Sequence, residues 1–373
     1  MPLVHEESVA SSGLEASALA RMPILILNVH SHCNCRCVMC DIWKRETHEQ
    51  VRVADLDRHR ASLRKLGVEQ VVLTGGEPLL HSDLDALCQF FRELGIRLTL
   101  LTTGLLLVKR ADEVSSLFDE VIVSIDGPGE IHDSIRRVRG AFGLIGRGVA
   151  EIRVRKPDML IACRTTVQKA NHRHLRATMV AARLLGFDSI SFLAADVTSE
   201  AFNRALVWPG ERQSEISLTV KEAGELEEEI ERLIVEHEED IRRRFIAEGP
   251  EKLRRIARRF REHLGQASPE SPVCNAPWVS AVIEVDGSVR PCFFHRAVGN
   301  VSSSSLEEVV NGEAAKLFRQ SLRVSENPTC RRCVCSLNYR GGSSEEETAD
   351  LSTALRSGRD DKGKRGASSE RGC

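Results

Sequence analysis

The sequence predicts an α/β fold, a parallel sheet covered by helices, followed by a small C-terminal domain that contains a hairpin. Three observations predict it. Short apolar runs alternate six times with stretches of helical periodicity between residues 24 and 193, which is typical of parallel sheets. Polar motifs follow the carboxyl ends of four successive runs, where α/β folds place their sites. Asp286-Gly287, between two short apolar runs, is a strong hairpin signal.

Each element of the alternation follows from a local pattern. Continuous apolar runs, typical of strands buried on both faces, occupy residues 24–29, 71–73, 98–101, 121–125, 160–167 and 190–193. Helical spacing of apolar residues occupies 56–66, 84–94, 114–117, 142–154 and 174–185. Three of these helices are followed at once by glycine, a common residue after a helix: Gly67, Gly95 and Gly186. Right-handed connections allow the six strands to curl toward a barrel.

The remaining segments differ in composition. Residues 1–21 are small and polar and predict a flexible lead-in, whereas 341–373 have almost nothing to bury and predict a disordered tail. The alternating part takes up 22–197. Residues 198–270 predict a charged helical connector, and 271–340 hold a second group of cysteines and the hairpin.

The connector carries apolar residues at helical spacing between 221 and 264, which predicts two surface helices with solvated charged faces. A lid over the site, or an RNA-facing basic patch at 254–261, are the alternatives. The formal net charge of the whole chain is only −2, which argues against nucleic acid as a partner.

Composition also bears on location. No apolar run reaches the length that spans a membrane, and the first apolar run is too short and wrongly flanked for a secretory signal. Twelve cysteines in such a chain indicate metal chemistry in a reducing compartment rather than disulfides. The expected location is therefore the cytoplasm.

Four cysteines lie within eight residues directly after the first predicted strand. Cys33, Cys37 and Cys40 have the spacing C-x3-C-x2-C, and Cys35 falls outside that pattern. Soft thiolates in one loop indicate zinc or an iron–sulfur cluster. Structural zinc usually takes four ligands, and three cysteines would leave one iron of a [4Fe–4S] cluster open. We interpret Cys35 as a bystander.

The cysteine spacing, together with Gly75-Gly76-Glu77-Pro78 after the next apolar run, resembles the radical S-adenosylmethionine (SAM) enzymes. The resemblance implies a partial (β/α)6 TIM-like barrel. It implies a [4Fe–4S] cluster held by Cys33, Cys37 and Cys40, with SAM bound at the open iron. The reduced cluster of such enzymes cleaves SAM to a 5′-deoxyadenosyl radical, which abstracts hydrogen from substrate. A structural zinc knuckle is the alternative.

The resemblance also implies residues that bind SAM. Gly75 and Gly76 let the backbone approach a ligand, and the Glu77 carboxylate can receive an ammonium group. Ser124 and Arg136 stand in Ser-Ile-Asp-Gly and His-Asp-Ser-Ile-Arg, which match the family pattern. Ser124 is expected to bond the SAM ribose or carboxylate, and Arg136 the carboxylate. The alternative for Arg136 is a surface helix arginine.

The C-terminal cysteines supply a second set of soft ligands, Cys274, Cys292, Cys330 and Cys333. Four thiolates also satisfy zinc. The spacing C-x12-G-x4-C, formed by Cys274, Gly287 and Cys292, resembles the opening of the SPASM extension of radical SAM enzymes, which carries auxiliary iron–sulfur clusters. Only Cys335 and Cys373 follow Cys333, too few for two clusters. One auxiliary [4Fe–4S] cluster of the shorter "twitch" type is expected, and Cys335 could replace Cys333.

The function that these resemblances imply is radical redox modification of a small molecule, because a fully ligated auxiliary cluster can accept an electron but cannot bind substrate. A peptide- or protein-modifying SPASM maturase is the first alternative, although only about twenty residues precede the first strand, too few for a leader-peptide domain. A non-catalytic metal-binding module is the second. The expected partners are the substrate and an electron donor such as flavodoxin or ferredoxin, with no membrane. The sequence identifies no catalytic acid or base.

Overall fold

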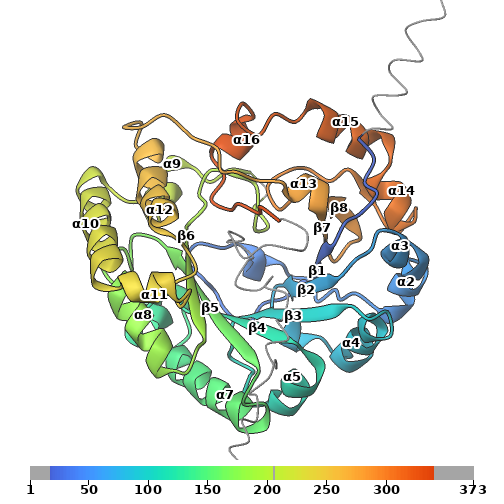
Figure 1. Cartoon of the computed structure of the whole chain (residues 1–373), viewed down its shortest axis with the longest axis horizontal. Coiled ribbons are helices and arrows are strands. Elements are labelled where there is room, and N and C mark those ends of the chain that lie inside the picture. Colours follow the sequence, from blue (N-terminus) through green and yellow to red (C-terminus); the bar gives the residue numbers. More distant parts are fainter. Residues whose placement is uncertain (1–16, 205, 340–373) are drawn as a thin grey trace, which may run out of the picture.

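The computed structural model describes residues 17–204 and 206–339. Its centre is an arc of six parallel strands in sequence order (Figure 1). They are β1 (Ile24–His30), β2 (Gln70–Gly75), β3 (Arg97–Thr102), β4 (Glu120–Ser124), β5 (Leu160–Val167) and β6 (Ser189–Ala194). The six predicted strands are thereby confirmed, as is the partial barrel. The tail at 341–373 and most of the lead-in lie outside the described residues.

Helices cover the outer face of the arc (Figure 1). They are α2 (Val53–Asp57), α3 (Arg60–Lys65), α4 (Leu84–Arg92), α5 (Ala111–Leu117), α7 (Ala141–Arg155) and α8 (Leu175–Leu184). The short helix α6 (Glu130–Arg136) instead contacts the segment after β1, and two 3-10 turns, η1 (Ile42–Lys44) and η2 (Pro78–Leu80), follow β1 and β2. On β1, Leu25 and Leu27 face the large outer core, and Ile24 and Ile26 belong to a separate cluster on the other face. Burial on both faces explains the continuous apolar runs.

The helix predicted over residues 56–66 is divided at Arg58 and His59 into α2 and α3. Both residues contact the C-terminal region. Arg58 Nη2 donates to the Val301 carbonyl at 2.5 Å, and His59 Nδ1 accepts from the Leu306 N–H at 3.3 Å. The division thus coincides with contacts to residues more than 240 positions away, which local periodicity cannot reveal.

The charged connector forms α9 (Gly210–Ser214), α10 (Val220–Glu236), α11 (Glu238–Arg242) and α12 (Pro250–His263). Thr219 and Glu222 form a capping box at the start of α10. The apolar stripes of α10 and α12 join the main core through Leu226, Leu233 and Phe260, among others. Next to them, the N–H of Ala247 donates to the carbonyl of Ile190 at 2.9 Å. This region therefore covers the β6 side of the sheet.

The C-terminal region contains α13 (Ala276–Val279), β7 (Ser280–Ile283), β8 (Ser288–Arg290), β9 (Gly299–Asn300), α14 (Leu306–Val310), α15 (Glu313–Ser321) and α16 (Pro328–Arg331). The predicted hairpin is present: β7 and β8 are antiparallel, and Gly287 in its turn has a φ of +82°. However, β7 also pairs in parallel with β1, from Ile24↔Ser280 to Leu27↔Ile283. The hairpin together with β9 therefore extends the barrel sheet to nine strands. The domain boundaries stay predictions.

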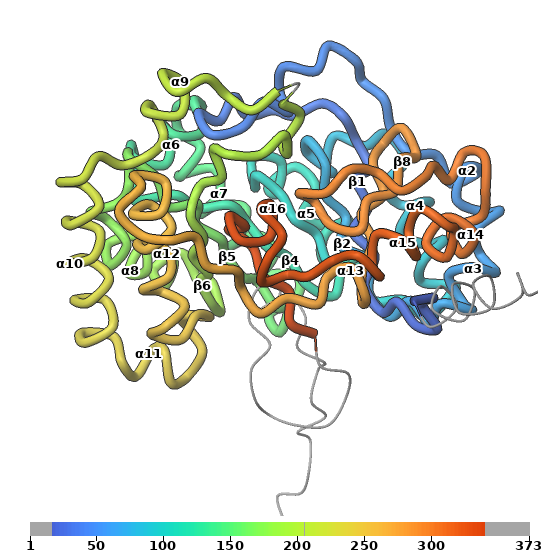
Figure 2. The backbone as a smooth tube through the Cα atoms, turned by 90° about the horizontal axis from the view of Figure 1, so that it is seen from above, coloured from blue at the N-terminus to red at the C-terminus, as the bar shows by residue number. Residues whose placement is uncertain are grey.

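The C-terminal region reaches from the β1 edge to α12 and closes the open side of the arc (Figures 1 and 2). Leu337 packs with Ile24, Ile26 and Val72 on the inner face of the strands. Within the described residues, no helix has both the length and the apolar composition needed to cross a bilayer.

Candidate active site

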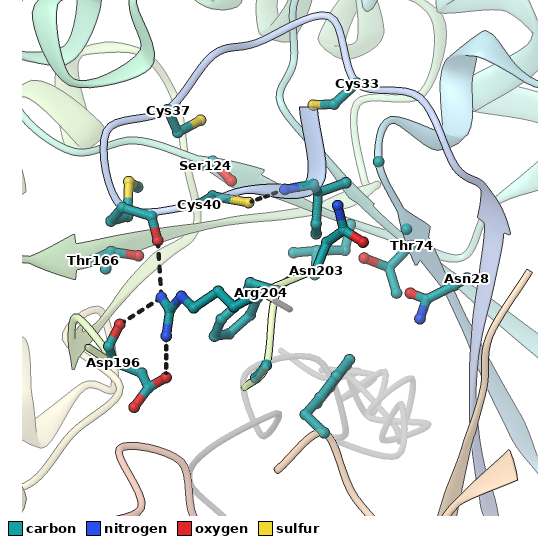
Figure 3. Close-up of a pocket in the computed structure, with 18 of the residues that line it drawn as sticks. Asn28, Cys33, Cys37, Cys40, Thr74, Ser124, Thr166, Asp196, Asn203 and Arg204 are labelled. Carbon is teal, nitrogen blue, oxygen red and sulfur yellow. Dashed lines mark hydrogen bonds and ion pairs between the residues drawn. The ribbon is translucent and has the colours of Figure 1, made fainter. Parts of the chain in front are cut away.

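A cavity of about 600 Å³ lies at the carboxyl ends of the six strands, where α/β barrels place their sites. Cys33, Cys37 and Cys40 form one wall, and Ser124 and Thr166 lie beside them (Figure 3). The C-terminal region supplies other lining residues, which are Glu284, Val285, Arg290, Phe293, Phe294, Val334 and Cys335. Segments from three separate parts of the chain therefore enclose one space.

The cysteine loop is attached to α6 by its backbone. The N–H of Arg36 donates to the carbonyl of Arg136 at 3.1 Å, and the N–H of Val38 donates to the carbonyl of Ile135 at 3.0 Å. Cys35 is only 1% exposed and packs with apolar neighbours such as Ile135. It does not line the cavity, in keeping with its interpretation as a bystander.

The thiol of Cys37 lies beside the buried guanidinium of Arg136, whose Nη1 is 3.5 Å from the sulfur. A hydrogen bond with Cys35 lowers the pKa of Cys37 to about 6, and the charge of Arg136 acts in the same direction against the effect of burial. This environment favours the thiolate, which is the form of cysteine that binds metals.

The Gly75-Gly76-Glu77 segment is tied to the start of the cysteine loop. The N–H groups of Gly76 and Glu77 donate to the carbonyls of His30 and His32 at 2.8 and 2.9 Å. A Cβ on Gly76 would lie 2.0 Å from the His32 carbonyl oxygen, and one on Gly75 2.6 Å from that of His30. Both glycines are therefore required by backbone packing, and both also line the cavity.

Asp126 and Arg136 form a buried ion pair next to Ser124. Arg136 Nε lies 2.6 Å from Asp126 Oδ2, and the two side chains are 9% and 0% exposed. Asp126 Oδ1 also accepts from the Thr166 N–H at 2.9 Å, so Asp126 fixes the end of β5 and the direction of Arg136. The alternative of Arg136 as a surface residue is wrong.

The segment after β6, residues 196–204 and 206–212, packs over the cysteine loop. Arg204 and Asp196 form an ion pair at 2.7 Å with side chains 0% and 2% exposed, and Arg204 Nη2 donates to the Met39 carbonyl at 3.2 Å (Figure 3). The Trp208 indole N–H donates to Asp41 Oδ2 at 2.7 Å. Arg212 donates to the Val38 carbonyl. We call residues 196–204 and 206–212 the strap.

Two family models match the chain. The model of the radical SAM superfamily matches residues 27–153, and that of an iron–sulfur cluster-binding domain, SPASM, matches residues 274–334. The chain belongs to the radical SAM superfamily. It is a radical SAM protein with a C-terminal SPASM domain, as predicted, and therefore uses a [4Fe–4S] cluster and SAM.

The chain is also similar to individual proteins along most of its length. The Fe-coproporphyrin III synthase of Methanosarcina barkeri (strain Fusaro / DSM 804) is 26% identical over 350 residues, which are 86% of this chain and 84% of that enzyme. The subtilosin biosynthesis protein AlbA of Bacillus subtilis (strain 168) is 24% identical, over 83% of this chain and 64% of AlbA. Streptococcus suis SuiB bound to SAM has the same fold, with a TM-score of 0.60, 16% identity and coverage of 88% and 76% of the two chains.

Four of the five residues predicted to bind SAM line the cavity: Gly75, Gly76, Ser124 and Arg136. The role expected of the Glu77 carboxylate is corrected. Its side chain is fully buried outside the cavity lining. It accepts hydrogen bonds from Thr102 Oγ1, Thr103 N and Thr103 Oγ1, each at 2.7 Å, and from Leu79 N at 3.0 Å. This carboxylate holds the β3 end in place and has no face left for an ammonium group.

The four SPASM cysteines predicted as ligands lie close enough to influence one another. Burial raises the pKa of Cys292 to about 11, and the Cys274 thiol acts in the same direction. Burial, Cys292 and Cys274 raise the pKa of Cys330 to about 12. Burial likewise raises the pKa of Cys333, which donates to the Cys335 carbonyl at 2.9 Å. A bound cation would reverse these shifts.

The arrangement of the three-cysteine loop fits a polynuclear cluster. The side chains of Cys33, Cys37 and Cys40 border the same cavity (Figure 3). Three thiolates are the donor set that an iron–sulfur cluster with one open iron takes.

Proposed function

We propose that the protein oxidises a small molecule bound in the cavity between the three-cysteine loop and the SPASM domain. The observation that carries the proposal is that one cavity is lined by Cys33, Cys37 and Cys40 and also by Phe293 and Cys335 of the SPASM domain. A substrate in this space would lie between the two iron–sulfur sites.

Different residues of the chain would bind the cluster, bind SAM and close the cavity. In radical SAM enzymes the [4Fe–4S] cluster supplies the electron that cleaves SAM to methionine and a 5′-deoxyadenosyl radical. Cys33, Cys37 and Cys40 would hold the cluster, and Arg136 would offer its guanidinium to the SAM carboxylate. Gly75, Gly76 and Ser124 shape the SAM side of the cavity. The strap closes this side, because Arg204 and Trp208 are buried against the cysteine loop.

The proposed oxidation removes two electrons from the substrate. The first electron would leave the substrate with a hydrogen atom, which the radical derived from SAM would take up. The second would leave with loss of a proton to solvent, and Cys274, Cys292, Cys330 and Cys333 would hold the single auxiliary [4Fe–4S] cluster that supplies its acceptor. We favour Cys333 over Cys335 as the fourth ligand, because Cys335 lines the cavity and the other four thiols do not.

A tetrapyrrole is the first substrate class to test. The Fe-coproporphyrin III synthase matches this chain along most of both lengths, and its name specifies a porphyrin product. Arg164 lies in the cavity wall, where its Nε donates to Ser191 Oγ at 3.2 Å; a guanidinium there suits a carboxylate-bearing ligand. Peptide modification is the second candidate, supported by the match to AlbA.

The deciding experiment is the iron and sulfide content after anaerobic reconstitution, for the intact chain and for Cys33→Ala/Cys37→Ala/Cys40→Ala. If the chain holds two four-iron clusters, the intact protein contains about eight irons per chain. The triple variant loses one cluster and contains about four. A Cys333→Ala variant should lose the other four, whereas Cys335→Ala should retain eight. About four irons falling to none in the triple variant would remove the auxiliary cluster and with it the proposed electron acceptor.

The substrate class is tested by adding other carboxylate-bearing tetrapyrroles to the reconstituted protein with SAM and a strong reductant; iron coproporphyrin, the product named for the relative, is the reference compound. We expect 5′-deoxyadenosine to form faster with such a tetrapyrrole than without it, together with a tetrapyrrole changed in mass. Unchanged tetrapyrrole, with modification of a peptide that is encoded beside the gene, would favour the second candidate. Both candidate functions require an electron donor such as flavodoxin or ferredoxin, because SAM cleavage consumes an electron.

A further inference from the structure

A second recess, of about 550 Å³, lies against the cysteine loop. It is lined by His32, Cys33, Asn34, Arg36, Trp43, Lys44, Arg45 and Glu46. Cys33 lines both this recess and the substrate cavity. Arg36 and Lys44 are exposed. The recess therefore connects solvent with a residue that holds the SAM-cleaving cluster, without passing through the substrate cavity.

Three cations line this recess: Arg36, Lys44 and Arg45. Backbone hydrogen bonds between residues 36–38 and 135–136 bring the end of α6 beside Arg36, and Arg137 and Arg139 follow directly after it. We call these five residues the basic rim. The side chains of Arg36, Arg137 and Arg139 are exposed, and no ion pair or hydrogen bond of these three guanidiniums is found in the described part of the chain.

The other two cations of the rim, Lys44 and Arg45, have hydrogen-bond or ion-pair partners. Arg45 Nε donates to Asn203 at 2.7 Å, and Lys44 pairs at 2.8 Å with Asp41, which also accepts from Trp208. Glu46 is the one acid among the lining residues. Because the whole chain has a net charge of −2, the positive charge is a local property of this face.

Trp43 provides a flat apolar surface inside the rim. Lys44 Nζ lies 5.7 Å from its ring centroid, and the buried indole nitrogen has no hydrogen-bond partner in the described residues. An aromatic residue within a ring of cations suits an acidic protein partner, because cations steer its approach and an aromatic contact holds it.

We propose that the basic rim is the docking surface for a small acidic one-electron carrier protein. The reduced carrier loses one electron and the [4Fe–4S] site behind Cys33 gains it, with no proton or atom transferred. This inference rests on the electron requirement of SAM cleavage stated under the proposed function. In this proposal the electron enters from the side of the basic rim, because Cys33 lines the recess there as well as the substrate cavity.

The test compares Arg137→Glu/Arg139→Glu, which lies outside the cysteine loop, with a matched control, Arg64→Glu/Arg147→Glu, which reverses two exposed arginines on α3 and α7. Cluster reduction is followed by stopped-flow absorbance with reduced flavodoxin, with reduced ferredoxin, and with photoreduced 5-deazariboflavin, a small uncharged reductant. A neutral variant, Arg137→Gln/Arg139→Gln, leaves the cysteine loop unchanged. It replaces the first variant in the same reduction measurements if the first variant does not fold.

We expect the rim variant to be reduced at least about tenfold more slowly by one of the carrier proteins at low ionic strength. The difference should vanish near 0.5 M salt, where the Debye length is about 4 Å. Reduction by deazariboflavin, the SAM cleavage it drives, and the control variant should be unchanged. Equal rates for wild type and rim variant, a wild-type rate independent of salt, or failure of both carriers to reduce the wild type would overturn the proposal.

The result separates this inference from the proposed function. If deazariboflavin drives no SAM cleavage in the wild type, the proposed function fails whatever the carrier does. If SAM cleavage proceeds and the rim instead binds a nucleic-acid oligomer, with carrier reduction unaffected by the charge reversals, the docking proposal alone is wrong.

Discussion

The Glu77 carboxylate accepts four hydrogen bonds, from Leu79, Thr102 and Thr103, and lies away from solvent and from the cavity. Burial raises its pKa, while these hydrogen bonds act in the opposite direction. A carboxylate in a motif that contacts a cofactor was reasonably expected to contact it too. Sequence identifies the motif but not which of its atoms face the ligand, because that depends on the position of β3.

Glu77→Ala should lower the free energy of unfolding by roughly 3 kcal/mol or more, because several buried donors lose their acceptor. Glu77→Gln should cost less, since it keeps one acceptor oxygen. Both are measured by anaerobic urea unfolding, with SAM affinity determined in parallel by calorimetry. Weakened SAM binding at unchanged stability would contradict the structural role and restore the direct contact.

At the scale of elements, the strap is the part of the site that sequence reasoning missed. Arg204 is enclosed by the Asp196 carboxylate and by the Trp208 ring, whose centroid is 3.9 Å from the guanidinium carbon. Phe202 extends from the strap to Phe294 of the SPASM domain, with ring centroids 6.2 Å apart. No periodicity marks such a segment. A buried arginine pair in an irregular stretch becomes visible only when the contacts are known.

Arg204→Gln should lower the free energy of unfolding by about 3–5 kcal/mol, because it leaves Asp196 charged and buried without its partner. Asp196→Asn/Arg204→Gln should recover part of the loss. Urea unfolding of the anaerobic protein measures both. The exposed pair of Arg232 and Glu228 provides the control, since Arg232→Gln should change stability by less than about 1 kcal/mol. An equal loss in the single and double variants would show that the charge of Asp196 is not the cause.

Across the whole molecule, structure that depends on nearby residues could be predicted from the sequence. Structure that depends on contacts between distant residues could not. The six strands and most helices follow from local apolar patterns, and four motif segments meet at one end of the sheet as expected. The parallel pairing of β7 with β1 joins residues about 256 apart, and α6 was hidden within the Ser-x-Asp-Gly to Arg136 motif. The division of α2 from α3 depends on Val301 and Leu306 in the same way.

The shared sheet and core predict one cooperative unfolding transition for the iron-free chain. Ala281, Ile283, Val289 and Leu306 of the SPASM domain belong to the same apolar cluster as the barrel strands. Far-ultraviolet circular dichroism and tryptophan fluorescence should therefore give coincident urea curves. A chain ending at Gly265 should show no comparable transition, because the edge of β1 and part of this cluster become exposed. Two separated transitions would indicate an independently folding SPASM domain.

The pairing of β1 with β7 has a consequence for electron tunnelling. The cysteine loop continues from the end of β1, and Cys292 follows β8, which pairs with β7. The cysteine loop and Cys292 are thus attached to two strands of one sheet, with only β7 between them. Relative motion of the two domains would therefore not change the distance between the cysteine loop and Cys292. An electron that leaves a substrate radical would cross a distance that the sheet keeps constant from one turnover to the next.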